Sequence, residues 1–244
     1  MHALLVWTSA QATDIGAKRK INEDAVLSRP DIGLWAVADG MGGHAAGDVA
    51  SQAVIDALLQ IKPDSDLPDC VDTIEDKILL VNHNLRRHGQ EALGGRTLGT
   101  TVVSLFIMDG LGACIWAGDS RLYLFREGEL RRISHDHSAV QEMIDSGMIT
   151  PDQAAHHPHR NVITRAVGGG DKLYPELRVF NVQPGDWYLL CSDGFYNEVS
   201  EDVMASLIVQ DTLEKSVAML MEKALMHGAA DNVSLIVVKV SEAS

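Results

Sequence analysis

Residues 100–134 read TTVVSLFIM-DG-LGACIWAG-DS-RLYLFR-EG-ELRRIS, and this stretch decides the fold. It holds four short runs rich in aliphatic, β-branched and aromatic residues, the composition typical of strands. The pairs Asp109-Gly110 and Glu127-Gly128 link neighbouring runs, and two-residue links that end in glycine favour tight hairpins. The stretch therefore predicts consecutive antiparallel strands rather than a regular alternation of strand and helix.

Long amphipathic helices are predicted on both sides of this stretch. Apolar residues recur at helical spacing in three segments, and Gly228 marks the end of the last one. Together with further strands, they give the order strands, helices, strands, helices, which indicates an α+β fold with helices covering antiparallel sheets. The predicted helices span about 46–61, 70–89 and 212–227, and the further strands span 33–38, 177–182, 186–192 and 232–240.

A single domain over 1–244 is expected, because the chain shows no internal repeat, low-complexity tract or proline-rich linker. The least regular part of the chain runs from about 138 to 172. It contains a short helix-like run, the histidine-rich HHPH and three successive glycines. We expect this part to form a mobile surface flap.

Charge and composition narrow the function. The chain carries 20 Lys and Arg against 34 Asp and Glu, a formal net charge of −14. Such a chain repels nucleic-acid phosphates and anionic lipids, so neither is an expected partner. Its 3 cysteines are too scattered for a zinc knuckle or a disulfide framework. Without a signal-peptide pattern or an apolar run long enough to span a membrane, a cytoplasmic protein is expected.

Acidic residues stand at the ends of several predicted strands. Asp39 and Asp193 close two strands and each precedes a glycine, Asp119 follows a third strand, and Asp231 precedes the last one. Carboxylates gathered at one rim repel one another unless cations neutralise them, and oxygen ligands suit Mg²⁺ or Mn²⁺. The glycine after Asp39 would let the carbonyl of Gly40 approach an ion. Taken singly, each Asp-Gly pair is more simply explained as a turn.

A compact basic cluster, Lys18-Arg19-Lys20, lies beside Glu23 and Asp24. Three consecutive basic residues are unexpected in a chain with a net charge of −14. Arg19 could hold a phosphate group through two hydrogen bonds while Glu23 or Asp24 faces metal-bound water. Taken alone, the cluster is explained more simply as a solvated loop.

Eight short motifs follow one another between residue 19 and residue 234. They are RKINED at 19–24, VADGMGGH at 37–44, GTT at 99–101, AGDSR at 117–121, HDHS at 135–138, NVITRAVG at 161–168, LCSDG at 190–194 and DNVS at 231–234. One such motif means little, but the ordered set is highly specific. On these motifs the chain resembles the PP2C-like (PPM) metal-dependent protein serine/threonine phosphatases, in their compact bacterial form.

The resemblance implies a four-layer α-β-β-α sandwich, with two central antiparallel sheets flanked by helices. It also implies two core Mn²⁺ or Mg²⁺ ions that Asp39 bridges, and a third ion in some members. Arg19 matches the arginine that grips the substrate phosphate. The implied ligands are Asp39, Gly40, Asp193 and Asp231 at the first site, Glu23 and Asp24 at the second, directly or through water, and Asp119 with Asp193 at the third.

The implied activity is hydrolysis of phosphoserine and phosphothreonine in proteins by a hydroxide that the two ions share. The implied partners are phosphorylated proteins and an opposing eukaryotic-type Ser/Thr kinase in bacterial signalling, for a phosphatase that acts as a monomer. Two other functions stay open: a catalytically silent phosphoprotein-binding relative, and a hydrolase of small phosphate esters. The presence of Asp39, Asp193 and Asp231 disfavours the silent relative.

Several residues have competing interpretations. Met41 stands where eukaryotic members have a histidine general acid, so the proton donor to the leaving group is unassigned. His44 is one candidate donor, although a structural or substrate-contact role is favoured for it. The histidines of HHPH at 156–159 are interpreted as exposed loop residues rather than a zinc site. Three hydroxyls are interpreted as hydrogen-bonding core groups rather than nucleophiles, those of Thr100, Thr101 and Ser120.

Overall fold

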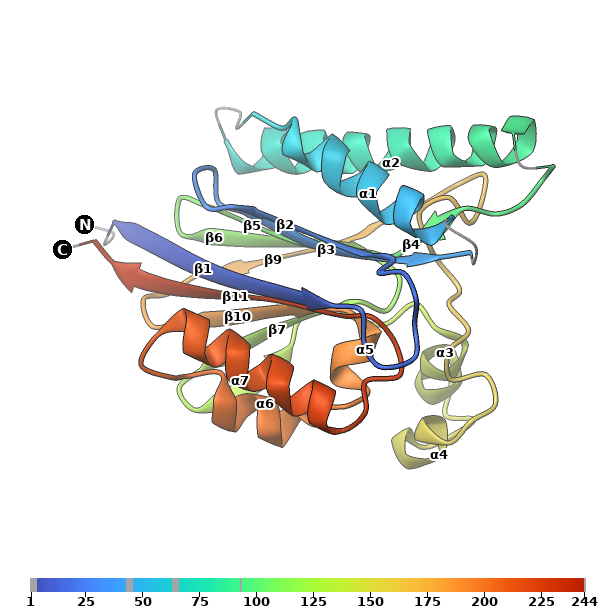
Figure 1. The fold of residues 1–244 in the computed structure, drawn as a ribbon. Helices are drawn as coiled ribbons and strands as arrows, with labels where there is room; N and C mark the ends of the chain where they lie inside the picture. The colour runs from blue at the N-terminus through green and yellow to red at the C-terminus, as the bar shows by residue number, and fades with distance from the viewer. Residues whose placement is uncertain (1–3, 43–45, 63–65, 93, 244) are drawn as a thin grey trace.

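Two antiparallel β-sheets form the centre of the protein (Figure 1), whose computed structural model describes residues 4–42, 46–62, 66–92 and 94–243. The first sheet contains, in spatial order, β1 (Leu5–Asp14), β11 (Val233–Glu242), β10 (Trp187–Cys191), β7 (Arg121–Arg126) and β8 (Glu129–Arg132). The second contains β2 (Asp24–Arg29), β3 (Leu34–Met41), β5 (Val102–Met108), β6 (Leu111–Ala117) and β9 (Glu176–Asn181), and the short β4 (Gly99–Thr100) pairs with β3.

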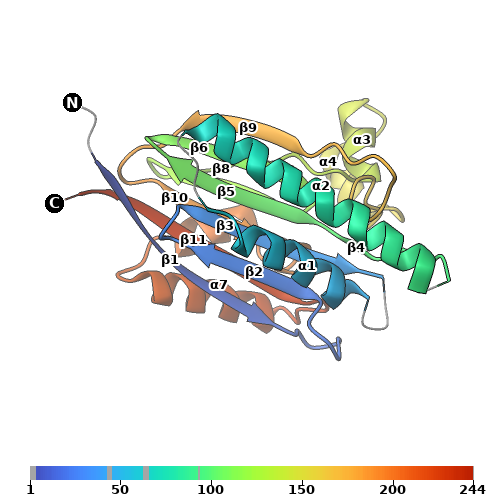
Figure 2. The same cartoon turned by 90° about the horizontal axis from the view of Figure 1, so that it is seen from above.

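Helices cover the outer face of each sheet (Figures 1 and 2). On one side, α1 (Gly47–Leu59) and α2 (Leu67–Ala92) pack on the second sheet through one apolar cluster. On the other side, α6 (Glu201–Leu207) and α7 (Leu213–Met226) pack on the first sheet, and the short α5 (Asp193–Tyr196) contacts α7 and β11. A third cluster fills the space between the sheets. The predicted four-layer sandwich is confirmed.

The stretch 100–134 supplies a hairpin to each sheet. The two predicted turns are present, with positive φ at Asp109 and Gly110 and again at Glu127 and Gly128, as tight hairpins require. The first turn joins β5 to β6 in one sheet, and the second joins β7 to β8 in the other. The chain therefore crosses between the sheets at the link 118–120.

Between β8 and β9, residues 138–163 lie outside the sandwich, at the lower right of Figure 1, and the chain then returns to β4 and α2, where Val167 is buried and bridged to Thr100. This outer part contains the expected short helix, α3 (Ala139–Asp145), and a second one, α4 (Pro151–Ala155). An isolated β-bridge between Ser138 and Ile163 holds its two halves together. Its mobility stays a prediction, as does the description of 1–244 as one domain.

Sequence patterning missed the two edge strands β1 and β2. In β1, LVWTSAQATD alternates only between exposed and half-buried residues, because the strand lies at a sheet edge. In β2, DAVLSR mixes polar and apolar residues for the same reason. Edge strands bury too little apolar surface to leave a clear period in the sequence. The other predicted elements are present, with ends shifted by a few residues.

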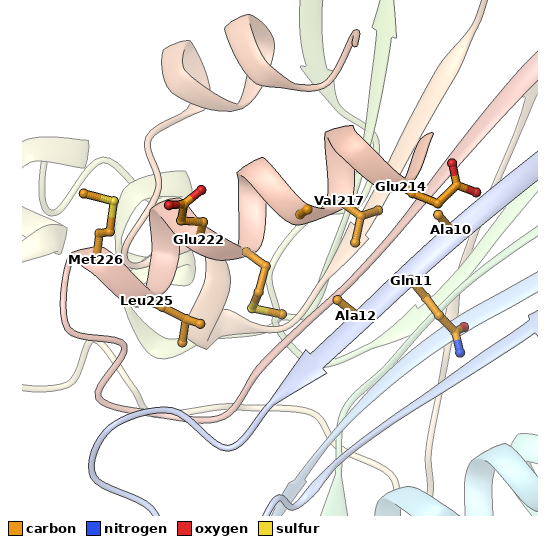
Figure 3. Close-up of a pocket in the computed structure, with 10 residues that line it drawn as sticks. Ala10, Gln11, Ala12, Glu214, Val217, Glu222, Leu225 and Met226 are labelled. Atoms are coloured by element: carbon orange, nitrogen blue, oxygen red, sulfur yellow. The ribbon is translucent and has the colours of Figure 1, made fainter. Parts of the chain in front are cut away.

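A shallow apolar groove of about 650 Å³ runs along α7 over β1 (Figure 3). Ala10 and Ala12 form its floor, and Val217, Met221 and Leu225 form its helical wall. None of the predicted site residues lines it. Within the described ranges, no helix combines the length and the apolar character that crossing a membrane would require.

Candidate metal centre

Aspartates from distant parts of the chain lie together at the end of the sheets where β4 and α5 stand in Figure 1. Asp24 opens β2 and is the register partner of Asp39 in β3. Asp119 lies in the link between the two sheets, Asp193 opens α5, and Asp231 lies two residues before β11. Their carboxylates repel one another across this end of the molecule. The predicted convergence is therefore present in the structure.

Two expectations about strand ends need correction. Asp39 does not close its strand, because β3 continues through Gly40 to Met41, where β4 pairs with it. Asp193 does not end a strand either, because β10 stops at Cys191 and Asp193 is the first residue of α5. Its carboxylate thus lies at a helix start, among backbone N–H groups.

The aspartate cluster is electrostatically strained. Burial raises the pKa of Asp24 and that of Asp119, each to about 7, and repulsion from Asp193 adds to both shifts. Burial, then repulsion from Asp24 and Asp193, raises the pKa of Asp39 as well. Burial and Asp231 raise the pKa of Asp193, against a hydrogen bond with Asp39 that lowers it. Carboxylates in this condition bind either protons or cations.

Unpartnered oxygens mark where a cation would fit. The Oδ1 atoms of Asp24 and Asp119 are buried without a hydrogen-bond partner, a costly condition that a bound cation relieves. In the part of the chain that the structure describes, no three Asp, Glu, His or Cys side chains already form a group that could hold a metal ion. The side chains of the cluster are therefore not already arranged as a complete ligand set. The all-oxygen donor set fits Mg²⁺ or Mn²⁺.

Arg19 and Asp231 form an ion pair, with Nη2 of Arg19 2.6 Å from Oδ2 of Asp231. This hydrogen bond raises the pKa of Arg19, and burial opposes it; Glu23 and Asp39 add smaller attractions. The Arg19 side chain is 49% exposed, so the guanidinium reaches both solvent and the cluster. The residue predicted to grip phosphate thus lies beside a predicted metal ligand.

Gly40 is required for close packing. A Cβ at this position would lie 2.1 Å from the carbonyl oxygen of Gly47, the first residue of α1. The Gly40 N–H donates to the carbonyl of Glu23 at 3.0 Å, and Oε1 of Glu23 accepts from the N–H of Gly47 at 3.2 Å. These contacts bring Glu23 and Gly40 to the same corner. The pattern Asp-Gly-Met-Gly did not reveal this packing role.

The hydroxyls near the cluster are held by hydrogen bonds. Thr101 Oγ1 accepts from the N–H of Asp39 at 3.0 Å and lies 2.7 Å from Oγ of Ser120. Thr100 Oγ1 donates to the carbonyl of Asp39 at 2.9 Å. All three side chains are buried. They serve as core hydrogen-bonding groups, as predicted.

Asn232 was missed, although it stands inside the motif DNVS. Its Oδ1 accepts from the N–H of Glu23 at 2.8 Å. Its Nδ2 donates to the carbonyls of Ile15 and Ile21, at 2.9 and 3.0 Å. One buried side chain thereby fixes the loop 15–23 to the start of β11. An asparagine directly after a candidate ligand was the only signal that could have found it.

Arg121 was missed as well. It makes a forked ion pair with the buried Asp136, with closest atoms 2.6 Å apart, and its guanidinium lies 3.5 Å from the ring centre of Tyr196. Because Tyr196 ends α5, this stack holds the helix that carries Asp193 against β7. Arginine at the end of AGDSR was the available signal.

The remaining candidates do not join the cluster. His44 falls outside the described residues. The ring centres of His157 and His159 lie 5.4 Å apart near α4; His156 and His159 are exposed, as expected for loop residues, whereas His157 is half-buried. Met41 is half-buried, with its side chain beside Gly99.

Residues 17–227, which include most of the two sheets and most of the cluster, match the family model "Protein phosphatase 2C". The chain belongs to that family. It is 37% identical over 236 residues to the serine/threonine protein phosphatase PstP of Mycobacterium tuberculosis, covering 97% of this chain and 45% of PstP. The chain thus spans about half the length of that relative.

Solved structures give the same result. "PppA, a key regulatory component of T6SS in Pseudomonas aeruginosa" superposes with a TM-score of 0.90 at 40% identity, covering 96% of this chain and 98% of that one. The catalytic domain of PstP in complex with 2 manganese ions superposes with a TM-score of 0.88 at 35% identity, covering 98% of this chain and 100% of the other.

Proposed function

We propose that this chain is a protein serine/threonine phosphatase domain that requires Mn²⁺ or Mg²⁺. The observation that carries the proposal is the cluster of buried, mutually repelling aspartates with two unpartnered oxygens. Uncompensated buried carboxylates destabilise a fold, and a divalent cation converts them into ligands. The two manganese ions in the related PstP domain support the same metal here.

Within the proposal, this chain's oxygens divide among two core ions and a third. When bound, the ions supply positive charge and lower the pKa of water. The proposed ligands are Asp39, the Gly40 carbonyl, Asp193 and Asp231 for the first ion, Asp39 with Glu23 and Asp24 for the second, and Asp119 with Asp193 for the third.

Arg19 is proposed to bind the substrate phosphate. Its present partner, Asp231, is itself a proposed ligand, so a cation that takes up Asp231 leaves the guanidinium free. A freed guanidinium can donate two parallel hydrogen bonds to phosphate oxygens and neutralise their charge. Its exposed position suits a phosphate carried on a protein surface.

The proposed substrates are phosphoserine and phosphothreonine in proteins, and the proposed counterpart is a Ser/Thr kinase that phosphorylates the same proteins. The names of the related phosphatases support this substrate class. We further propose a cytoplasmic monomer in which 1–244 is one domain. The segment 138–172 would act as a mobile flap, which the place of residues 138–163 outside the sandwich supports.

The test is phosphate release from a phosphothreonine peptide with Mn²⁺, with Mg²⁺ and with EDTA, beside the variants Asp193→Ala and Asp72→Ala. We expect turnover that requires metal, is lost in Asp193→Ala and is kept in Asp72→Ala, because Asp72 is exposed on α2. Folded, metal-loaded protein without turnover would instead favour a silent phosphoprotein-binding domain. Turnover of p-nitrophenyl phosphate but not of the peptide would favour a hydrolase of small esters.

A further inference from the structure

His137, in the motif HDHS, has no part in the proposed chemistry, yet it is buried against the site. Its imidazole is only 6% exposed and stacks on Trp116, with the ring planes 10° apart. Two hydrogen bonds join it to Gly118. The backbone N–H of His137 donates to the Gly118 carbonyl, and the Gly118 N–H donates to Nδ1 of His137, each at 3.0 Å.

These contacts determine the protonation of the ring. Because the Gly118 N–H is a donor, Nδ1 of His137 must be the unprotonated acceptor nitrogen. The ring proton therefore lies on Nε2, which is 3.0 Å from Oε1 of Glu176 and donates to it. Burial lowers the pKa of His137, which agrees with a neutral ring. Protonation of Nδ1 would place its N–H opposite the Gly118 N–H, and two donors cannot form a hydrogen bond with each other.

Gly118 occupies a backbone position that only glycine fits. Its φ is +115°, and a Cβ there would lie 2.6 Å from Cβ of Thr101. The next residue, Asp119, is an aspartate whose buried Oδ1 lacks a partner. The direction of that carboxylate thus depends on how the Gly118 backbone is held.

The same histidine contacts the segment that follows β8. The carbonyl of His137 accepts from the N–H of Thr164 at 2.8 Å. Glu176, which accepts from Nε2, also accepts from Arg165 at 3.1 Å. His137 therefore joins the link between the sheets to the 139–175 segment through both its backbone and its side chain.

We propose that His137 is a positioning residue: by holding Gly118 through its unprotonated Nδ1, it fixes Asp119 and sets the metal affinity of the site to which Asp119 contributes. This inference rests on the proposed function, because it takes Asp119 as a ligand. Residues that orient a ligand in this way typically change metal affinity by roughly 10- to 100-fold when replaced.

Two substitutions distinguish the roles of the two ring nitrogens, Nδ1 and Nε2. His137→Asn places an amide oxygen where Nδ1 lies and keeps an acceptor for Gly118, whereas His137→Gln extends toward the Nε2 position and loses that acceptor. His135→Gln is the matched control, since His135 lies in the same motif but is partly exposed and pairs with Asp145. The measurement is calorimetric titration of metal-free full-chain protein with Mn²⁺.

For His137→Gln we expect the weakest resolved Mn²⁺ site to lose affinity by roughly 10-fold or more, with His137→Asn and the control close to wild type. In phosphate release, His137→Gln should need more Mn²⁺ for half-maximal rate while kcat at saturating Mn²⁺ recovers. A folded His137→Gln with the wild-type titration overturns the inference. Equal weakening in the Asn and Gln variants overturns it too, because general packing would then be the cause.

A measurement on wild-type protein covers the case in which a variant fails to fold. Nitrogen NMR of the imidazoles should show His137 neutral with its proton on Nε2, and the Gly118 amide should shift as Mg²⁺ is added. A proton on Nδ1 contradicts the inference. Wild-type protein that binds no metal and releases no phosphate contradicts the proposed function itself. Normal metal binding in wild type with unaffected variants removes only the role of His137.

Discussion

At the scale of single residues, the proposed function gives Asp231 two roles. In this structure it neutralises Arg19 at 2.6 Å. On the proposal, a bound cation would take the same oxygen as a ligand and release the guanidinium toward solvent. The proposal therefore couples metal binding to phosphate binding through one ion pair. A half-exposed pair of this kind contributes little stability, so its exchange costs little.

Replacing Arg19 tests this coupling. Arg19→Ala should lower kcat/KM about 10- to 100-fold at saturating Mn²⁺, mainly through KM, because a charge-assisted hydrogen bond contributes roughly 1.5–3 kcal/mol. Lys18→Ala removes the same charge from the neighbouring residue and should leave KM nearly unchanged. Steady-state kinetics on a phosphothreonine peptide distinguish the two. An equal KM in both variants would remove the assigned role of Arg19.

Among single residues, the aspartates of the cluster could be predicted from the sequence. The residues that hold neighbouring backbone in place, Asn232 and His137, could not. Asp39, Asp119 and Asp231 stand beside glycines or strand ends, which the sequence displays. Asn232 and His137 act through backbone partners more than 15 residues away, at Glu23 and Gly118. Such contacts exist only after the sheets have formed, so no local pattern records them.

At the scale of elements, Asn232 joins the loop 15–23 to β11. The Asn232→Ala variant should weaken this connection and so lower the stability of the fold. The variant leaves two carbonyls and one N–H without partners, so a loss of about 2–3 kcal/mol in unfolding free energy is expected. Because Glu23 is one of those partners, the Mn²⁺ concentration for half-maximal activity should also rise.

Asn84→Ala is the control for this prediction, since Asn84 is exposed on α2. It should change stability by less than about 0.5 kcal/mol. Urea unfolding of the metal-free proteins gives the comparison. Asn232→Ala with wild-type stability and wild-type Mn²⁺ dependence would show that the loop is held by other contacts.

Elements were predictable where their burial is regular. The central hairpins of 100–134 and the amphipathic α7 have apolar residues at the period of their structure, so both are confirmed. The edge strands β1 and β2 carry no such period. The passage of the chain from one sheet to the other at Gly118 was also hidden, because a hairpin signal does not specify which sheet receives the strands.

At the scale of the whole molecule, the aspartate cluster lies where several elements from both sheets meet. A cation held there joins β2, β3, α5 and the start of β11, so binding should stabilise the entire fold. At a 100-fold excess over Kd, mass action gives about 2.7 kcal/mol, which corresponds to a rise in Tm of roughly 5–10 °C for a chain of this size.

Thermal unfolding with Mn²⁺ and with EDTA measures this effect. Asp39→Asn should abolish most of the rise, because Asp39 lies at the centre of the cluster. Asp109→Asn removes a charge from a hairpin turn and should keep the rise. A Tm that is indifferent to Mn²⁺ in wild-type protein would mean that the cluster does not bind the ion.

The pairing of β1 with β11 places the two ends of the described chain together. Leu5 is opposite Glu242 at one end of this ladder, and Asp14 is opposite Val233 at the other, beside the cluster. Ten residues of strand separate the two ends of the ladder by roughly 30 Å. A tether fused before residue 4 or after residue 243 would therefore attach far from the aspartates, and either end could anchor the chain without crowding the proposed metal site.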